Sequence, residues 1–188
     1  MPRPKILDRL FGQTPLEKAA SALYLALVEQ ARQPRAYRDW AVPDTLDGRF
    51  DMIVLHVALV IRRIKFGPGE TAKADRDRIT QSLFDYMFND MDRSLREIGV
   101  TDLGVAKRIK HMAAAFYGRA EAYQSALNAG EGLAEALRRN IYRKTDASDG
   151  EVDALAAYVA ALAADIEAQP LEALMAGTIG FPDPEGCA

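Results

Sequence analysis

Few side chains in this sequence have the type and spacing that chemistry requires. The 188 residues include two histidines, His56 and His111, and one cysteine, Cys187. No Cys-x-x-Cys pair, His-Glu-x-x-His motif or phosphate-binding glycine loop occurs. An acidic cluster near Asp90 lacks the loop of an EF-hand calcium site. We therefore predict no catalytic residues, no metal site and no cofactor, and we interpret the protein as a non-enzyme.

His56 interrupts the longest apolar run, residues 52–61 (MIVLHVALVI). Such a run is about half the length of a membrane-spanning helix, so it predicts a helix buried in the core. We interpret His56 as a neutral core histidine that is hydrogen-bonded to a neighbouring helix. The alternative is a small-molecule or enzyme pocket lined by His56, Met87 and Met112.

Composition and charge narrow the class of protein. Hydrophobic residues make up 49% of the chain, and 24 basic residues face 27 acidic ones, for a net charge of −3. A DNA-binding domain is normally strongly basic, so no DNA partner is expected. One cysteine and no visible secretory signal predict a cytoplasmic protein, with peripheral attachment to the inner face of the cytoplasmic membrane left open.

Helix signals recur along the chain, whereas strand signals are scarce. Thr14, Pro15 and Glu17 form a capping-box pattern, Thr45 or Asp44 suits the start of the apolar helix, and Ser148 suits a third start. The sequence predicts an all-α, single-domain bundle of about six to eight helices around a central apolar helix. We expect an N-terminal arm over residues 1–13, the helical domain over 14–176 and an irregular tail over 177–188.

Methionines and aromatic residues gather on two predicted helices, at about 74–98 and from 102 onward. Methionine is common at surfaces that accept varied apolar partners, so we predict a groove for an apolar helical client. Ordinary core packing is the alternative. The candidate groove residues are Met87, Met91, Met112, Phe116 and Tyr117.

Basic residues occupy the other face of the second of these helices. Lys107, Arg108, Lys110 and Arg119 lie there, three of them near a helix N-terminus, where the helix dipole disfavours cations. We predict a contact face for an anionic partner, with a merely solvated face as the alternative. A module that contacts RNA or the ribosome is a further reading of the same residues.

Three blocks of sequence are more specific. They are residues 37–51 (YRDWAVPDTLDGRFD), 83–100 (LFDYMFNDMDRSLREIGV) and 105–123 (VAKRIKHMAAAFYGRAEAY). In this order they resemble the ubiquinol–cytochrome c chaperone family. The first block and the apolar helix that follows it supply a structural signature of Trp40, Asp44, Thr45, Arg49, Asp51 and His56. We expect Arg49 and Asp51 to organise the start of the apolar helix.

The resemblance implies a helical, non-enzymatic protein. Mitochondrial members of the family help to assemble the cytochrome bc1 complex by engaging newly made cytochrome b, and they act at the ribosome with a small partner protein. This chain is similar to a bacterial version, because it does not show the long N-terminal targeting and anchoring extension of the mitochondrial members. The expected partner is nascent or newly inserted cytochrome b, with a peripheral membrane or ribosome contact.

Overall fold

A computed structural model describes residues 13–182, and over that range the chain is helical without strands. This confirms the predicted all-α fold. Residues 1–12 and 183–188, which include most of the predicted arm and Cys187, lie outside the described residues. The helices are α2 (Pro15–Ala31), α3 (Pro34–Arg38), α4 (Leu46–Phe66), α5 (Lys73–Glu97), α6 (Asp102–Ala129), α7 (Leu133–Asn140), α8 (Asp149–Ala168) and α9 (Leu171–Met175).

Helix starts follow the predicted caps. The Thr14 hydroxyl accepts a hydrogen bond from the Glu17 amide, and the Glu17 carboxylate accepts one from the Thr14 amide, at 3.2 and 2.7 Å. Ser148 and Glu151 form the same capping box at α8. These bonds satisfy amides that a helix start otherwise leaves without a partner. At α4 the cap is Thr45, whose hydroxyl accepts from the Gly48 amide at 3.1 Å.

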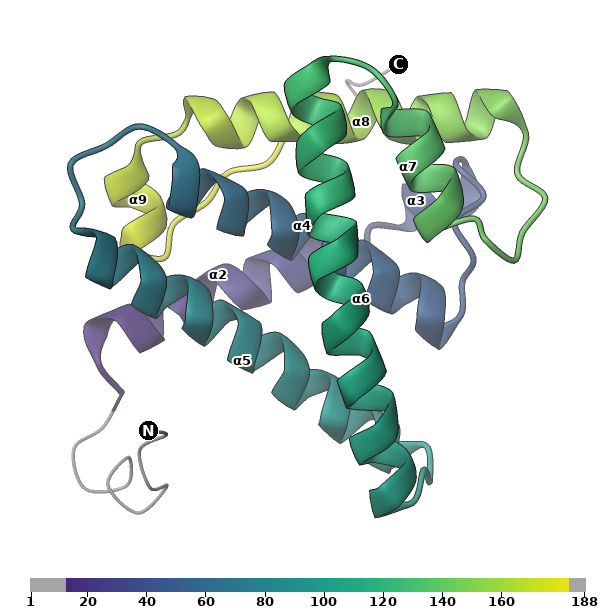
Figure 1. Cartoon of the computed structure of the whole chain (residues 1–188), viewed down its shortest axis with the longest axis horizontal. Helices are drawn as coiled ribbons and strands as arrows, with labels where there is room; N and C mark the ends of the chain where they lie inside the picture. The colour runs from purple at the N-terminus through teal and green to yellow at the C-terminus, as the bar shows by residue number, and fades with distance from the viewer. Residues whose placement is uncertain (1–12, 183–188) are drawn as a thin grey trace.

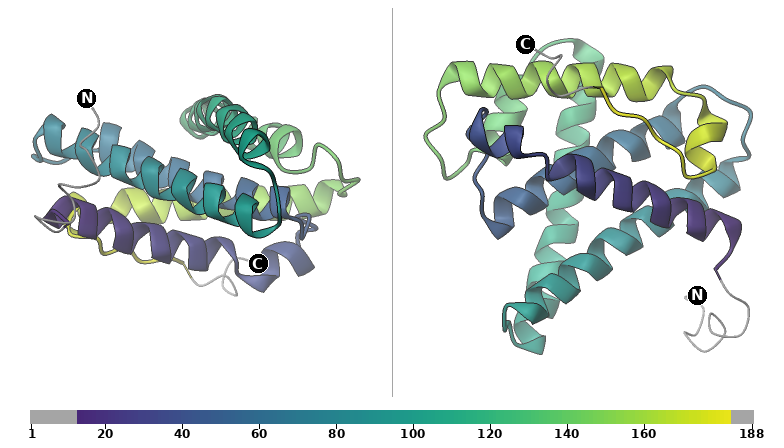
Figure 2. Two further views of the ribbon diagram at one scale, coloured as in Figure 1. Left: turned by 90° about the horizontal axis from the view of Figure 1, so that it is seen from below. Right: turned by 180° about the vertical axis from the view of Figure 1, so that it is seen from behind.

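Helix α4 is the central element. It contacts α2, α5, α6, α8 and α9, and residues 51–60 are buried on every side. Figure 2 shows α6 lying across one side of this core, whereas α2 and α8 lie on the other. The apolar run thus forms a core helix, as its length and composition predict.

His56 is fully buried in α4, and both ring nitrogens have a partner. Its Nδ1 lies 2.8 Å from the Met52 carbonyl oxygen, which only accepts, so Nδ1 carries the proton. Its Nε2 then accepts from the Tyr158 hydroxyl at 2.9 Å, and the Gln30 amide donates to that hydroxyl at 3.0 Å. This polar chain joins α2, α4 and α8, and it confirms His56 as a hydrogen-bonded core histidine.

Arg63 connects the end of α4 to the end of α8. It is buried, and its guanidinium donates to the carbonyl oxygens of Glu167, Pro68 and Gln169 at 3.2, 3.0 and 2.9 Å. A cation beside the last carbonyls of a helix is stabilising, because the helix dipole is negative there. The same bonds also fix the turn that follows α4.

Helices α5 and α6 extend beyond the rest of the molecule. A short turn connects the end of α5 at Glu97 to the start of α6 at Asp102, and the two helices converge there, at the lower end of the view in Figure 1. Ile98, which directly follows α5, is 60% exposed at this end. Leu95, three residues earlier, is only 2% exposed, so burial along α5 stops at its last turn.

Removing the Tyr158 hydroxyl tests the polar chain. Tyr158→Phe leaves His56 Nε2 and the Gln30 amide buried without a partner, so we expect the free energy of unfolding to fall by about 2 kcal/mol or more. Urea unfolding measures it. Tyr117→Phe, which removes a hydroxyl from an exposed ring, is the matched control. Equal effects of the two substitutions would contradict the role of the chain.

Burial also makes His56 a source of pH dependence. Burial lowers the pKa of His56 from 6.5 to about 4, so between these values the unfolded chain binds more protons than the folded one. The free energy of unfolding is then expected to fall by about 3 kcal/mol as the pH drops through this window. His56→Gln should remove that part of the pH dependence. Urea unfolding at neutral pH and near pH 4 compares the two slopes; identical slopes would rule the effect out.

Candidate functional site

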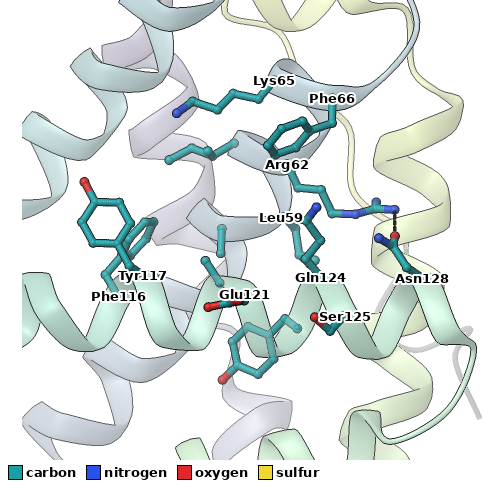
Figure 3. Close-up of a pocket in the computed structure, with 14 residues that line it drawn as sticks. Leu59, Arg62, Lys65, Phe66, Phe116, Tyr117, Glu121, Gln124, Ser125 and Asn128 are labelled. Carbon is teal, nitrogen blue, oxygen red and sulfur yellow. Dashed lines mark hydrogen bonds between the residues drawn. The ribbon is translucent and has the colours of Figure 1, made fainter.

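A cleft of about 530 Å³ opens between the C-terminal half of α4 and the C-terminal half of α6. Figure 3 shows side chains from both helices facing the same opening. The floor is apolar, since Leu59 and Phe116 are buried there. The exposed or half-exposed side chains around it are Ile61, Arg62, Lys65, Phe66, Tyr117, Ala120, Glu121, Gln124, Ser125 and Asn128.

Two large aromatic side chains stand at the rim of this cleft. Phe66 on α4 is 68% exposed, and Tyr117 on α6 is 63% exposed. The Tyr117 ring rests on Phe84 of α5 with ring centroids 5.7 Å apart, and Phe116 meets Phe84 edge to face at 5.3 Å. Exposed aromatic residues on a firm apolar base are typical of protein interfaces, because they offer large contact areas at low entropic cost.

Arg62 marks the polar end of the cleft. Its guanidinium donates to the Asn128 side chain at 3.1 Å and lies 3.5 Å from the Glu167 carboxylate. Arg62 also lines a second hollow of about 530 Å³ on the far side of α6, beside α8. Small residues line that hollow, among them Ala126, Gly130, Ala156, Ala157, Ala160, Ala163 and Ala164.

Asp51 determines how α6 lies against α4. It is 2% exposed, and its two carboxylate oxygens lie 2.7 Å from Arg119 of α6 and 2.8 Å from Arg143, which follows α7. Burial raises the pKa of Asp51 to about 6, although the two guanidinium groups act in the opposite direction. The carboxylate is therefore charged at neutral pH and holds the middle of α6 near the start of α4.

The other signature residues also organise this region. Trp40 is buried against Tyr158 with ring centroids 4.8 Å apart. Thr45 caps α4, and Arg49 pairs with Asp44 at 2.6 Å. Gly48 is required at this start, because a Cβ there would lie 2.0 Å from the Pro43 carbonyl oxygen.

The predicted groove needs correction. Met87, Met91 and Phe116 are buried, at 0%, 4% and 3% exposure, so all three belong to the core, and Met87 and Met91 do not line the cleft. Met112 is half-buried, and only Tyr117 is freely exposed. Helical periodicity identified the right face of α5 and α6, but these two helices cover each other there. Of the five, Phe116 and Tyr117 line the cleft with α4.

The predicted basic face divides into two parts. Lys107, Arg108 and Lys110 are exposed. Arg119 forms an ion pair with the buried Asp51 and is therefore not available for a partner. Arg119 follows Arg108 by about three helical turns, so both lie on the side of α6 that faces the α4 start. Arg108 there lines a hollow with Asp51, Arg143 and Lys144.

Phe66 is the main site residue that the sequence alone did not identify. It follows the cations Arg62, Arg63 and Lys65 at the end of α4, and its ring is largely exposed to solvent. A large apolar side chain directly before the break at Gly67 and Pro68 was the available signal, because a helix end rarely buries its last residue. Arg62 and Lys65 flank it in the cleft.

The cleft combines an apolar floor with a rim of polar and aromatic side chains. Among residues 13–182, no group of three or more His, Cys, Asp or Glu side chains could hold a metal ion. His56, the centre of the alternative pocket, is enclosed in the core with both ring nitrogens bonded. Within the same residues, no helix is long and apolar enough to cross a membrane. The arrangement is that of a helical protein with a cleft whose floor is apolar.

Comparisons with known proteins show which family this helical fold belongs to. The family model described as ubiquinol-cytochrome C chaperone matches residues 38–181. A solved structure, the crystal structure of the Cbp3 homolog from Brucella abortus, is 37% identical, with a TM-score of 0.79 over 96% of this chain and 97% of that one. A comparison with curated proteins gave no match.

The chain therefore belongs to the ubiquinol–cytochrome c chaperone family, which confirms the resemblance of the three sequence blocks. Membership of a chaperone family favours a non-enzymatic role.

Asp51→Asn tests the ion pairs that position α6. The substitution leaves Arg119, at 11% side-chain exposure, without a counter-ion, so we expect the free energy of unfolding to fall by about 3 kcal/mol. Asp44→Asn breaks the exposed pair with Arg49 and should change little. Urea unfolding compares the two variants. Similar stabilities would show that the buried pair does not hold α6 in place.

Proposed function

We propose that this protein is an assembly chaperone that binds newly made cytochrome b and supports biogenesis of the cytochrome bc1 complex. The family assignment supports the assembly role. The observation that carries the binding proposal is the cleft between α4 and α6, with Phe66 and Tyr117 exposed at its rim. An integral membrane client presents apolar helices before its assembly is complete, and such helices bind in apolar grooves.

The composition of the cleft suits a client helix. Leu59 and Phe116 provide a buried apolar floor, whereas Lys65, Glu121 and Gln124 offer polar partners at the rim. A helix that enters can bury apolar side chains between Phe66 and Tyr117 while its polar groups stay at the edge. The small residues of the second hollow, beyond Arg62, would allow a helix backbone to approach α8 closely.

The place of action follows from this proposal. Cytochrome b is inserted into the cytoplasmic membrane of a bacterium, so we place the protein in the cytoplasm, at the inner face of that membrane. The client is then engaged during or soon after insertion. Neither a cofactor nor a chemical step is needed for this role, since the cleft acts by covering apolar surface.

Deleting the gene tests the role in assembly. We expect lower cytochrome b and less assembled cytochrome bc1 complex, measured by haem difference spectra and by native gel electrophoresis. Re-expression of the wild-type chain should restore both. Unchanged cytochrome b in the deletion strain would end the proposal.

Rim substitutions test the cleft in the same strain. Phe66→Ser with Tyr117→Ser removes both exposed aromatic anchors, so we expect cytochrome b captured by the tagged protein to fall at least about tenfold. Leu25→Ser removes an equally exposed apolar side chain from α2 and is the control. If the double variant folds normally by circular dichroism and still captures as much cytochrome b as the wild type, the client binds elsewhere on the molecule.

A further inference from the structure

The projecting end of the α5–α6 pair is apolar at its extreme point. Ile98 is 60% exposed and Leu103 is 84% exposed, on either side of the turn between the two helices. Figures 1 and 2 show this end standing away from α8, α9 and α7. Exposed side chains of this size are few in the described residues, and these two lie within six positions of each other.

The charges at this end are unequally paired. Arg96 pairs with Asp92 at 2.6 Å and also with Asp102, whereas Arg93 pairs with Asp90 and lies 3.9 Å from Glu97. Two arginines thus face four carboxylates, so these contacts offset half of the acidic charge near the turn. Lys107 and Lys110, the first lysines of α6, are exposed and have no acidic partner within residues 13–182.

The free lysines share a helix face with the apolar tip. Lys107 and Lys110 follow Leu103 by four and seven positions, a spacing that places all three on one side of α6. The buried side of the same helix carries Val105 and Phe116. The outward face of α6 is thus apolar at its end and cationic over the next two turns.

We propose that this tip docks on a membrane surface that contains anionic phospholipid. Leu103 and Ile98 enter the boundary between headgroups and acyl chains, and Lys107 and Lys110 contact the phosphates above it. Apolar anchors at the leading point with cations set back by one or two turns match the order of layers in a bilayer. A nucleic acid would not favour this order, because its outermost groups are phosphates, which two aliphatic side chains cannot contact well.

This geometry is independent of the identity of the client. Tyr117 lies about 20 Å along α6 from Leu103, so docking by the tip would hold the cleft above the membrane surface with its opening beside α6. The protein could then hold an emerging helix near the bilayer. Docking would remain even if that helix belonged to a protein other than cytochrome b.

Flotation with vesicles tests the docking. The purified full-length chain is mixed with vesicles of equimolar phosphatidylglycerol and phosphatidylcholine, or with vesicles of phosphatidylcholine alone. We expect it to float with the first and not with the second, and raised salt should weaken the binding. Leu103→Ser and Lys107→Glu should each lower the bound fraction. For the lysine variant, we expect the partition coefficient to fall at least about fivefold.

Two variants serve as matched controls. Leu25→Ser and Lys18→Glu make the same changes at exposed positions of α2, and we expect both to bind as the wild type does. No binding to anionic vesicles, or equal losses in the α2 and α6 variants, would overturn the proposal. It would also fall if the chain bound an RNA hairpin in a gel-shift assay through Lys107 but did not bind vesicles. Loss of bc1 complex with intact flotation would count against the chaperone proposal alone.

Discussion

The arrangement of the molecule depends on hydrogen-bond partners for a polar side chain in the middle of a helix that is buried on every side. In α4 that side chain is His56, and the bonds from Gln30 through Tyr158 to His56 and Met52 supply the partners. Each bond has a donor and an acceptor from a defined position, so α2 and α8 cannot slide along α4 without breaking one. A wholly apolar α4 would bury as much surface but would not specify this register.

The cleft is a consequence of a second buried contact. The carboxylate of Asp51 draws Arg119, and with it the middle of α6, toward the start of α4. From there α6 runs over α4 to Asn128, which accepts a hydrogen bond from Arg62, and Arg62 also pairs with Glu167 of α8. Because the two helices cross and do not lie parallel, the space between their later turns stays open, and Phe66 and Tyr117 face it.

Sequence patterns predicted the elements well, because caps and apolar runs are local. Thr14, Thr45 and Ser148 start helices as expected, and the run around His56 is the core helix. The site was predicted less well, since a side chain's exposure depends on what covers its face. Met87, Met91 and Arg119 lie on the predicted faces, but α5, α6 and Asp51 cover them. A local sequence pattern does not predict which of two apolar helix faces is covered by another helix in the folded protein.

The projecting end of α5 and α6 has a further consequence for how the protein opens. Leu95 and Val105 are buried there, but neither belongs to the continuous core cluster that includes Met91 and Phe116. The last turns of α5 and the first turns of α6 thus lie outside that cluster, as is typical of segments that open locally. Amide hydrogens in these turns should exchange with solvent through local opening, whereas those of α4 should exchange only through global unfolding. The tip can thus change its conformation without disturbing the core.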